Sequence, residues 1–220
     1  MRAQSIQLVL SEGKTSGLWS RPPNPKAAFI FAHGAGAGME HPFMQDLSAR
    51  LFRQGIATLR FNFPYMEAEK KRPDPPAVAK STVEAAFLWV KEKEPKLPVF
   101  LGGKSFGGRM ASQLAAEKPL VLDGLVYVGF PLHPPDKPDT KRATHLKAIE
   151  FPQLFLQGTR DKLAELKLIR KVLKPIRKAT LLVVEGADHG FQVLKRSGRT
   201  SEDVMDELAT SISEWMRTDV

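Results

Sequence analysis

The sequence contains no cysteine in its 220 residues. This absence excludes disulfide bonds, cysteine-ligated metal ions, iron–sulfur clusters held by cysteine and a cysteine nucleophile. No run of about 18 apolar residues occurs, so no membrane-spanning helix is expected. The apolar stretch near the N-terminus is too short for the core of a secretory signal, and no small-residue cleavage site follows it closely. These absences predict a soluble protein of the cytoplasm.

Acidic residues are fewer than basic ones: 24 Asp and Glu stand against 33 Lys and Arg, which gives a formal net charge of +9. Such an excess can favour anionic partners. The basic residues are scattered, however, and the densest clusters, at 70–72 and 167–178, are interleaved with apolar residues or followed by prolines. No basic motif with interleaved aromatic residues that could stack bases is visible. A solvated basic surface is expected, and binding of nucleic acid through charge alone is the third-ranked interpretation.

Short apolar runs recur along the chain and alternate with helical patterns. The runs predicted as strands lie at residues 5–10, 27–33, 56–61, 97–102, 124–129, 152–157 and 180–185. Most of them are nearly continuous in apolar residues, which is typical of strands buried on both faces of a parallel sheet. The alternation predicts an α/β fold: a doubly wound, mostly parallel sheet of about seven strands flanked by helices. One domain over residues 1–220 is expected, because neither of the two proline-rich segments is long enough to fold alone.

The strongest chemical motif is Gly-Lys-Ser-Phe-Gly at residues 103–107, which matches G-x-S-x-G. It follows an apolar run and precedes a helical pattern, and this is the setting of a nucleophile elbow around Ser105. In such a strained turn the neighbouring backbone passes close to the serine, so small residues are needed on both sides. The alternatives are a simple glycine-rich turn or a phosphate cradle. A phosphate loop would need G-x-x-x-x-G-K-[ST], and that spacing is absent.

A serine hydroxyl becomes a good nucleophile only when a base takes its proton. In an elbow of this kind the chain order is serine, acid, histidine. His189 follows the last predicted strand and Asp161 follows the strand before it, so both belong to the same sheet edge as Ser105. Asp161 could instead cap a helix that begins near residue 162. Asp188 is the rival acid, but a sequence neighbour of His189 would rarely point back at the ring.

Attack on a carbonyl also requires backbone N–H groups for the developing oxyanion. The N–H of Phe106 directly follows the nucleophile at a helix start. The second donor is expected in the loop His-Gly-Ala-Gly-Ala-Gly at residues 33–38, where Ala35 is favoured and Gly36 stays open. The alternative for this loop is a dinucleotide site. Its glycines do not fit G-x-G-x-x-G, and the next predicted strand does not end in an acidic residue.

Two proline-rich segments, at 62–77 and 131–152, follow predicted strand ends, where ligand sites form in open α/β sheets. They are expected to shape the substrate pocket. The candidate substrate-binding residues are Tyr65, Met66, Leu132 and His133, with ordinary packing as the alternative interpretation.

Four segments together resemble the α/β-hydrolase fold superfamily. They are His-Gly at 33–34, Gly-Lys-Ser-Phe-Gly at 103–107, Gly-Thr-Arg-Asp at 158–161 and Asp-His-Gly-Phe at 188–191. More narrowly, Arg-Phe-Asn-Phe-Pro-Tyr at 60–65 and Phe-Pro-Leu-His-Pro-Pro at 130–135 resemble the small branch without a cap domain that is termed dienelactone-hydrolase-like. Dienelactone hydrolases proper use a cysteine nucleophile, whereas this chain has Ser105, so that specific activity is not carried over.

The sequence therefore predicts a serine hydrolase that cleaves a small carboxylic ester or thioester through an acyl-enzyme. Ser105 attacks the carbonyl, His189 takes the proton, and Asp161 orients the imidazole. Neither a metal ion nor an organic cofactor is required. The alternative is a catalytically silent binding scaffold on the same fold, because a fold does not guarantee an activity. The complete set of three residues, in the expected order, argues for the enzyme.

Overall fold

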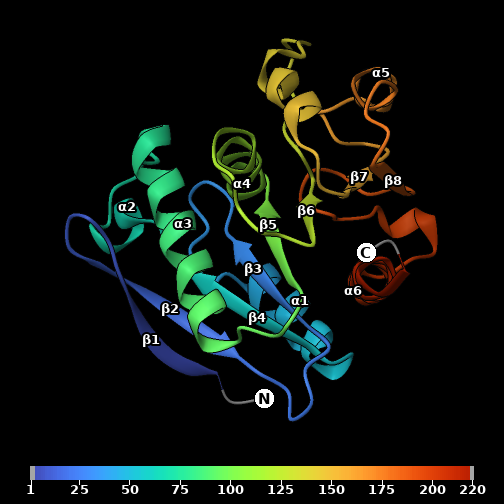
Figure 1. Cartoon of the computed structure of the whole chain (residues 1–220). Helices are drawn as coiled ribbons and strands as arrows, with labels where there is room; N and C mark the ends of the chain where they lie inside the picture. The colour runs from blue at the N-terminus through green and yellow to red at the C-terminus, as the bar shows by residue number, and fades with distance from the viewer. Residues whose placement is uncertain (1–2, 219–220) are drawn as a thin grey trace.

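The computed structural model describes residues 3–218, and a sheet of eight strands forms its centre (Figure 1). The strands are β1 (Gln4–Val9), β2 (Lys14–Ser20), β3 (Ala27–Ala32), β4 (Ile56–Phe61), β5 (Val99–Lys104), β6 (Gly124–Val128), β7 (Gln153–Gly158) and β8 (Ala179–Val184). Their order across the sheet is β1-β2-β4-β3-β5-β6-β7-β8. β2 is antiparallel to β1 and β4, and all pairs from β4 to β8 are parallel. The predicted α/β class with a mostly parallel sheet is confirmed.

The strand missing from the sequence prediction is β2. Its sequence Lys-Thr-Ser-Gly-Leu-Trp-Ser begins with polar residues, and exposed or half-buried positions alternate with buried ones. Such a pattern is expected of an antiparallel strand near a sheet edge rather than of a strand buried on both faces. By contrast, every residue of β3 and β4 is buried. β3 is a continuous apolar run, whereas β4 has the buried polar residues Thr58 and Arg60 among its apolar ones.

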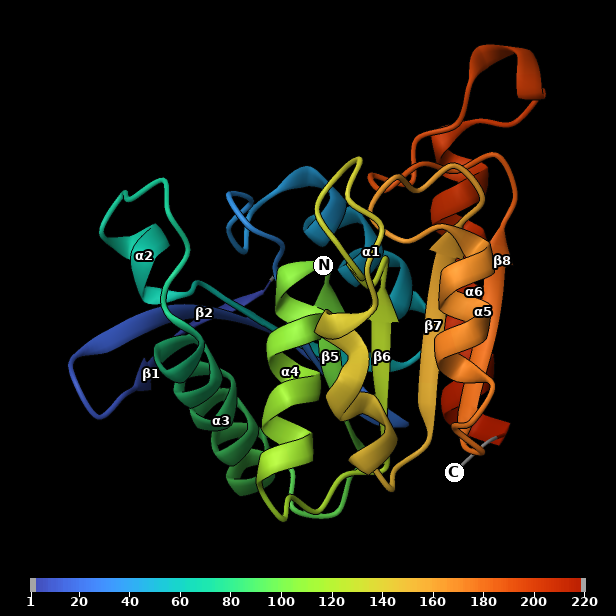
Figure 2. The same ribbon diagram turned by 90° about the horizontal axis from the view of Figure 1, so that it is seen from above.

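Helices cover both faces of the sheet, as a doubly wound fold requires. The helices are α1 (Pro42–Arg53), α2 (Pro64–Glu67), α3 (Pro76–Lys93), α4 (Phe106–Glu117), α5 (Leu166–Leu173) and α6 (Ser201–Thr218), and the 3₁₀ segments are η1 (Lys141–Ala148) and η2 (Lys195–Ser197). One core cluster joins the sheet to α3, α4 and α5, and a second joins it to α1 and α6 (Figures 1 and 2). Each face thus has its own apolar core.

The parallel run from β4 to β8 brings the carboxyl ends of six strands to one edge of the sheet. Figure 2 shows strands β5 to β8 side by side in this arrangement. The loops after β3, β4, β5, β7 and β8 therefore meet at this edge, although they are far apart in the sequence. Within residues 3–218, no helix combines the length and the apolar character that a bilayer crossing requires.

Candidate active site

Ser105 lies at the turn between β5 and α4, where its backbone has φ 48° and ψ −111°. A positive φ is uncommon outside glycine, so this turn is strained. The neighbouring glycines make it possible: a Cβ at Gly103 would lie 2.3 Å from the carbonyl oxygen of Ala32, and a Cβ at Gly107 would lie 2.5 Å from the same atom. The Ser105 side chain makes no capping hydrogen bond to α4. Its hydroxyl is therefore available for other contacts.

The structure brings Ser105 together with His189 and Asp161. His189 Nε2 lies 2.8 Å from Ser105 Oγ, and His189 Nδ1 lies 2.7 Å from Asp161 Oδ2. With the proton on Nδ1, the imidazole donates to Asp161 and accepts from the serine hydroxyl. Asp161 is 3% exposed, whereas His189 is half-buried. The three side chains form one continuous hydrogen-bonded chain from a buried carboxylate to an accessible hydroxyl, as nucleophilic catalysis requires.

The Asp161 carboxylate is held by three donors. Its Oδ2 also accepts from Gln157 Nε2 at 2.5 Å, and its Oδ1 accepts from the N–H of Leu163 at 2.7 Å. These bonds fix the plane of the carboxylate relative to the His189 ring. The helix that Asp161 could have capped begins only at Leu166, with Glu165 at its N-cap position. The capping interpretation therefore does not account for Asp161.

Asp188, the rival candidate for the acid, does not bond to the His189 ring but stabilises the loop that carries it. Its Oδ1 accepts from the backbone N–H groups of Gly190 and Gln192, at 2.8 and 2.9 Å. These two bonds close the turn that carries His189. Asp188 thus shapes the loop, and the hydrogen bond to the ring comes from Asp161.

The loop between β3 and α1 offers a backbone donor next to the serine. The N–H of Gly36 is already bonded to Tyr65 Oη at 2.9 Å, and the N–H of Ala37 to the carbonyl of Gly34 at 3.2 Å. Within residues 3–218, the N–H of Ala35 has no hydrogen-bond acceptor. Phe106 is the first residue of α4, where backbone N–H groups have no partner within the helix. Of the two alternatives left open by the sequence, the free donor is Ala35.

The segment 60–65 holds this loop in place. Arg60 donates to the Met39 carbonyl at 2.8 Å, and the Asn62 side-chain oxygen accepts from the Met39 N–H at 2.8 Å. Together with the bond from Gly36 to Tyr65, these contacts fasten the loop at two points. This explains what the Arg-Phe-Asn-Phe-Pro-Tyr sequence does: its side chains frame the backbone next to the serine.

His33 is fully buried at the start of the same loop. Its Nδ1–H donates to the Gly34 carbonyl at 2.7 Å, and its Nε2 accepts from the N–H of Phe63 at 3.1 Å. Burial lowers the pKa of His33 to about 4, with the hydrogen bond to Gly34 opposing the shift. The imidazole is therefore neutral at pH 7, and both of its nitrogens serve structure.

The free energy of unfolding is expected to fall as the pH drops from about 6.5 towards 4. Unfolded His33 takes up a proton near its ordinary pKa, whereas folded His33 does so only near pH 4, so acid favours the unfolded chain. The difference corresponds to roughly 3 kcal/mol at the acid end of this window. Denaturant titrations between pH 7 and 5, above the range where most carboxylates protonate, should capture about 2 kcal/mol of it. His33→Gln should reduce the slope by about half, because burial lowers the pKa of His145 to about 4 as well and His145 contributes the remainder. Equal slopes in both proteins would contradict this assignment.

A cavity of about 340 Å³ opens beside Ser105 and His189. Most of its lining is apolar and is contributed by Ala35, Ala37, Phe43, Met44 and Leu163. Two of these side chains, Phe43 and Met44, lie in the first turn of α1, and the sequence pattern did not single them out as part of the site. Their position shortly after the glycine-rich loop at residues 33–38 could have indicated that they lie near the serine. Within residues 3–218, no cluster of three or more histidine or acidic side chains is placed to hold a metal ion.

The four candidate substrate-binding residues do not line this cavity. Tyr65, Leu132 and His133 are buried, and Met66 is half-buried beside Gly38. The backbone N–H groups of Leu132 and His133 both bond to the carbonyl of Leu163, at 2.9 and 3.1 Å. The second proline-rich segment thus supports the wall from behind, while Leu163 itself faces the cavity.

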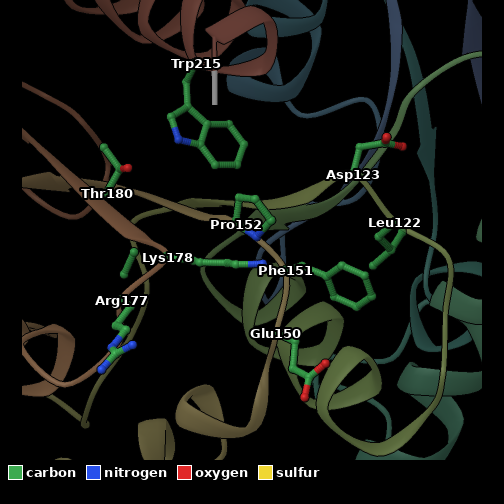
Figure 3. A pocket seen from close by; sticks show the side chains of 10 residues that line it. Leu122, Asp123, Glu150, Phe151, Pro152, Arg177, Lys178, Thr180 and Trp215 are labelled. Atoms are coloured by element: carbon green, nitrogen blue, oxygen red, sulfur yellow. The ribbon is translucent and has the colours of Figure 1, made fainter. Parts of the chain in front are cut away.

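A second cavity, of about 610 Å³, is lined by residues that precede β6, β7 and β8, at the opposite edge of the sheet. Figure 3 shows its lining side chains. Leu122 and Asp123 precede β6, Glu150 and Phe151 precede β7, and Trp215 comes from the end of α6. It is larger than the first cavity, but it contains none of the three hydrogen-bonded residues. The chemistry of the site therefore belongs to the carboxyl edge.

Comparison with known proteins places these features in context. The family model described as an alpha/beta hydrolase domain matches residues 25–217. A Mycobacterium tuberculosis protein named "Putative phosphoribosyl transferase" is 27% identical over 197 residues, which cover 87% of this chain and 43% of that protein. The chain thus spans less than half the length of this curated relative.

Solved structures show the same fold. An alpha-beta serine hydrolase homologue from Coxiella burnetii superimposes with a TM-score of 0.78 at 20% identity, covering 97% of each chain. The dienelactone hydrolase of Anabaena variabilis gives a TM-score of 0.77 at 21% identity, covering 99% of this chain and 98% of that one. At these identities the likeness establishes the architecture, and the chemistry has to be argued from the side chains.

Proposed function

Because this chain belongs to the alpha/beta hydrolase domain family, we propose that it is a serine hydrolase that cleaves a carboxylic ester or thioester through an acyl-enzyme. Family membership supports a hydrolase in general. The observation that carries the finer proposal is the hydrogen-bonded chain from Asp161 through His189 to Ser105, with 2.7 and 2.8 Å between the bonded atoms.

The geometry supports a two-step acyl transfer. Ser105 Oγ attacks the carbonyl carbon while His189 Nε2 takes the hydroxyl proton, and Asp161 stabilises the imidazolium that forms. The N–H groups of Ala35 and Phe106 donate to the oxyanion. His189 then gives its proton to the departing alcohol or thiol, and an acyl-serine remains. In the second step His189 takes a proton from water as the water oxygen attacks the acyl group. The bond to Ser105 Oγ then breaks, His189 returns the proton to Oγ, and the carboxylic acid leaves.

The lining of the cavity indicates which part of a substrate it accepts. Ala35, Ala37, Phe43, Met44 and Leu163 present apolar surface next to the serine. Burying apolar surface stabilises a complex by about 25 cal/mol per Å². We therefore assign the cavity to an apolar acyl or alcohol group, and we expect kcat/KM to rise with chain length until about 340 Å³ is filled.

The proposal is tested with a fluorophosphonate probe, which reacts covalently with an activated serine. The wild-type protein should be labelled and Ser105→Ala should not. A panel of p-nitrophenyl esters and matched thioesters of increasing acyl length then identifies the preferred bond and chain. A folded wild-type protein that neither reacts with the probe nor hydrolyses any member of the panel would rule out the enzyme and favour a binding scaffold.

Tyr65→Phe is expected to lower kcat about 10-fold with little change in KM, because the loop that carries Ala35 loses a hydrogen bond that positions it. The loss should be smaller than the roughly 10²–10³-fold cost of deleting an oxyanion donor, since the donor itself stays. Steady-state kinetics with one p-nitrophenyl ester measure it. The matched control is Tyr127→Phe, which removes a buried hydroxyl bonded to Gln153 away from the cavity. A raised KM at unchanged kcat would instead place Tyr65 in substrate binding.

A further inference from the structure

Lys104 directly precedes Ser105 and is the last residue of β5. Its Nζ donates to the backbone carbonyl of His189 at 2.5 Å. Within residues 3–218, this is the only hydrogen bond that the His189 carbonyl accepts. One side chain therefore connects the strand that carries the hydroxyl to the loop that carries the imidazole, across 85 positions of the sequence.

Aromatic rings enclose the ammonium group of Lys104. Nζ lies 5.8 Å from the centroid of the Phe43 ring and 5.4 Å from that of Phe191. Both distances are within the range of cation–π attraction. Gly129 lies beside the ammonium group and leaves room for it, because a Cβ at this position would lie only 3.2 Å from Nζ. The ammonium thus occupies a site shaped for it, in which the His189 carbonyl is its hydrogen-bond acceptor.

Among the described residues, no carboxylate pairs directly with this cation. Within residues 3–218, Lys104 has no ion-pair partner within 4.0 Å. Burial lowers the pKa of Lys104 to about 8, and the more distant charges of Asp161 and Asp188 oppose the shift. An unpaired, partly desolvated charge costs folding free energy. A contribution to stability therefore does not explain why a lysine occupies this position. A role in function explains it better.

The loop that Lys104 holds is strained. Gly186, with φ 73°, permits the bend before His189 without strain, whereas Phe191 after it has φ 61°. Phe191 is bulky, and such a residue rarely adopts positive φ. The bonds that Asp188 accepts close the turn internally, but they do not connect it to the nucleophile. The contact from Lys104 supplies that connection.

We propose that Lys104 is a positioning residue for the catalytic base: it holds the His189 carbonyl and so keeps the imidazole in line with Ser105 Oγ. This inference rests on the proposed function of the same site. Lys104 also lines the cavity beside Ser105, but its ammonium group is engaged by the His189 carbonyl, so in this proposal it acts through His189. It therefore affects the rate of the chemical steps and leaves ground-state binding of the substrate unchanged.

The test replaces Lys104 with methionine, which keeps an unbranched side chain of similar length and removes the donor and the charge. We expect kcat to fall about 10- to 100-fold with KM unchanged, as for a small misplacement of a catalytic group. The fall should be the same factor for a neutral ester and for an ester of equal length that carries a carboxylate. Tm should stay the same or rise, because a partly desolvated charge without an ion-pair partner is removed. Lys80→Met is the matched control, since it removes a lysine that pairs with Glu117 far from the cavity.

Three outcomes would overturn the proposal. A loss confined to the carboxylate ester and seen in KM would make Lys104 an anion-binding group. An unchanged kcat would remove any role in positioning. A fall in Tm with kcat per folded molecule unchanged would make its role structural.

A readout independent of turnover separates this proposal from the proposed function. The Nδ1 proton of His189, hydrogen-bonded to Asp161, gives a low-field proton resonance. We expect this resonance to be sharp in the wild-type protein and broadened or lost in Lys104→Met. If the wild type hydrolyses nothing in a Ser105-dependent manner, the proposed function fails. A resonance that is identical in both proteins shows that Lys104 does not hold the ring.

Discussion

Replacing Ser105 with alanine is expected to lower kcat by about 10⁶, which corresponds to roughly 8 kcal/mol of lost transition-state stabilisation. The size of the effect follows from the roles in the acyl-transfer scheme, because without the hydroxyl no acyl-enzyme can form. The residual rate should come from the oxyanion donors and from substrate binding. Initial rates with a p-nitrophenyl ester, at enzyme concentrations high enough to detect the remaining activity, measure it.

The matched control for this substitution is Ser112→Ala, because Ser112 also contacts a histidine, His145. Ser112 Oγ lies 2.7 Å from His145 Nε2, but this hydroxyl is buried in α4 and donates to the Arg109 carbonyl at 2.8 Å. It is bonded to a histidine yet lies outside the cavity beside Ser105. Ser112→Ala should therefore cost some stability, about 1–3 kcal/mol, and leave kcat per folded molecule intact. A Ser105→Ala variant that kept the wild-type rate would remove Ser105 from the mechanism.

Asp161→Asn is expected to lower kcat by about 10⁴, because it should force the wrong tautomer of His189. In the wild-type protein both carboxylate oxygens accept hydrogen bonds, from His189 and Gln157 on one side and from Leu163 on the other. An amide NH₂ in either position faces a donor. When it faces His189, the ring must accept at Nδ1 and carry its proton on Nε2. It can then no longer take the proton of Ser105.

The control for Asp161 is its sequence rival. Asp188→Asn keeps an oxygen that can accept from the N–H groups of Gly190 and Gln192, so a loss of only a few-fold in kcat is expected. Stopped-time assays of both variants with the same ester compare them directly. If Asp188→Asn showed the larger loss, the orienting acid would have to be reassigned.

The features that could be predicted from the sequence are those whose structure permits only a few residue types at each position. At Gly103 and Gly107, beside the strained turn at Ser105, a Cβ would lie 2.3 and 2.5 Å from the Ala32 carbonyl oxygen, so only glycine fits there. The motif could therefore be recognised from the sequence alone. The buried parallel strands were visible for a similar reason, because both of their faces require apolar residues. The order of strands then predicted that Asp161 and His189 reach the same edge as Ser105, and the structure places the three side chains in contact.

The features that were not predictable depend on contacts between distant segments. β2 mixes polar and apolar residues because it lies in the antiparallel part of the sheet. The lining residues Phe43 and Met44 show the same helical spacing as core residues, and only the path of the preceding loop turns them towards the serine. Tyr65 was assigned to the pocket on position alone, whereas its hydroxyl accepts from Gly36 and holds the loop. In each case the role of the residue depends on a segment far away in the sequence that contacts it, and the residue type alone does not identify that segment.

The start of α1 has a consequence for how such a protein can diversify. It supplies His41 and Met44 to the wall of the cavity but none of the three hydrogen-bonded residues, which follow β5, β7 and β8. Part of the cavity wall is thus encoded in a different stretch of the polypeptide from the three hydrogen-bonded side chains. We therefore expect substitutions at positions 41 and 44 to change which molecules fit the cavity while the three hydrogen-bonded side chains stay in place.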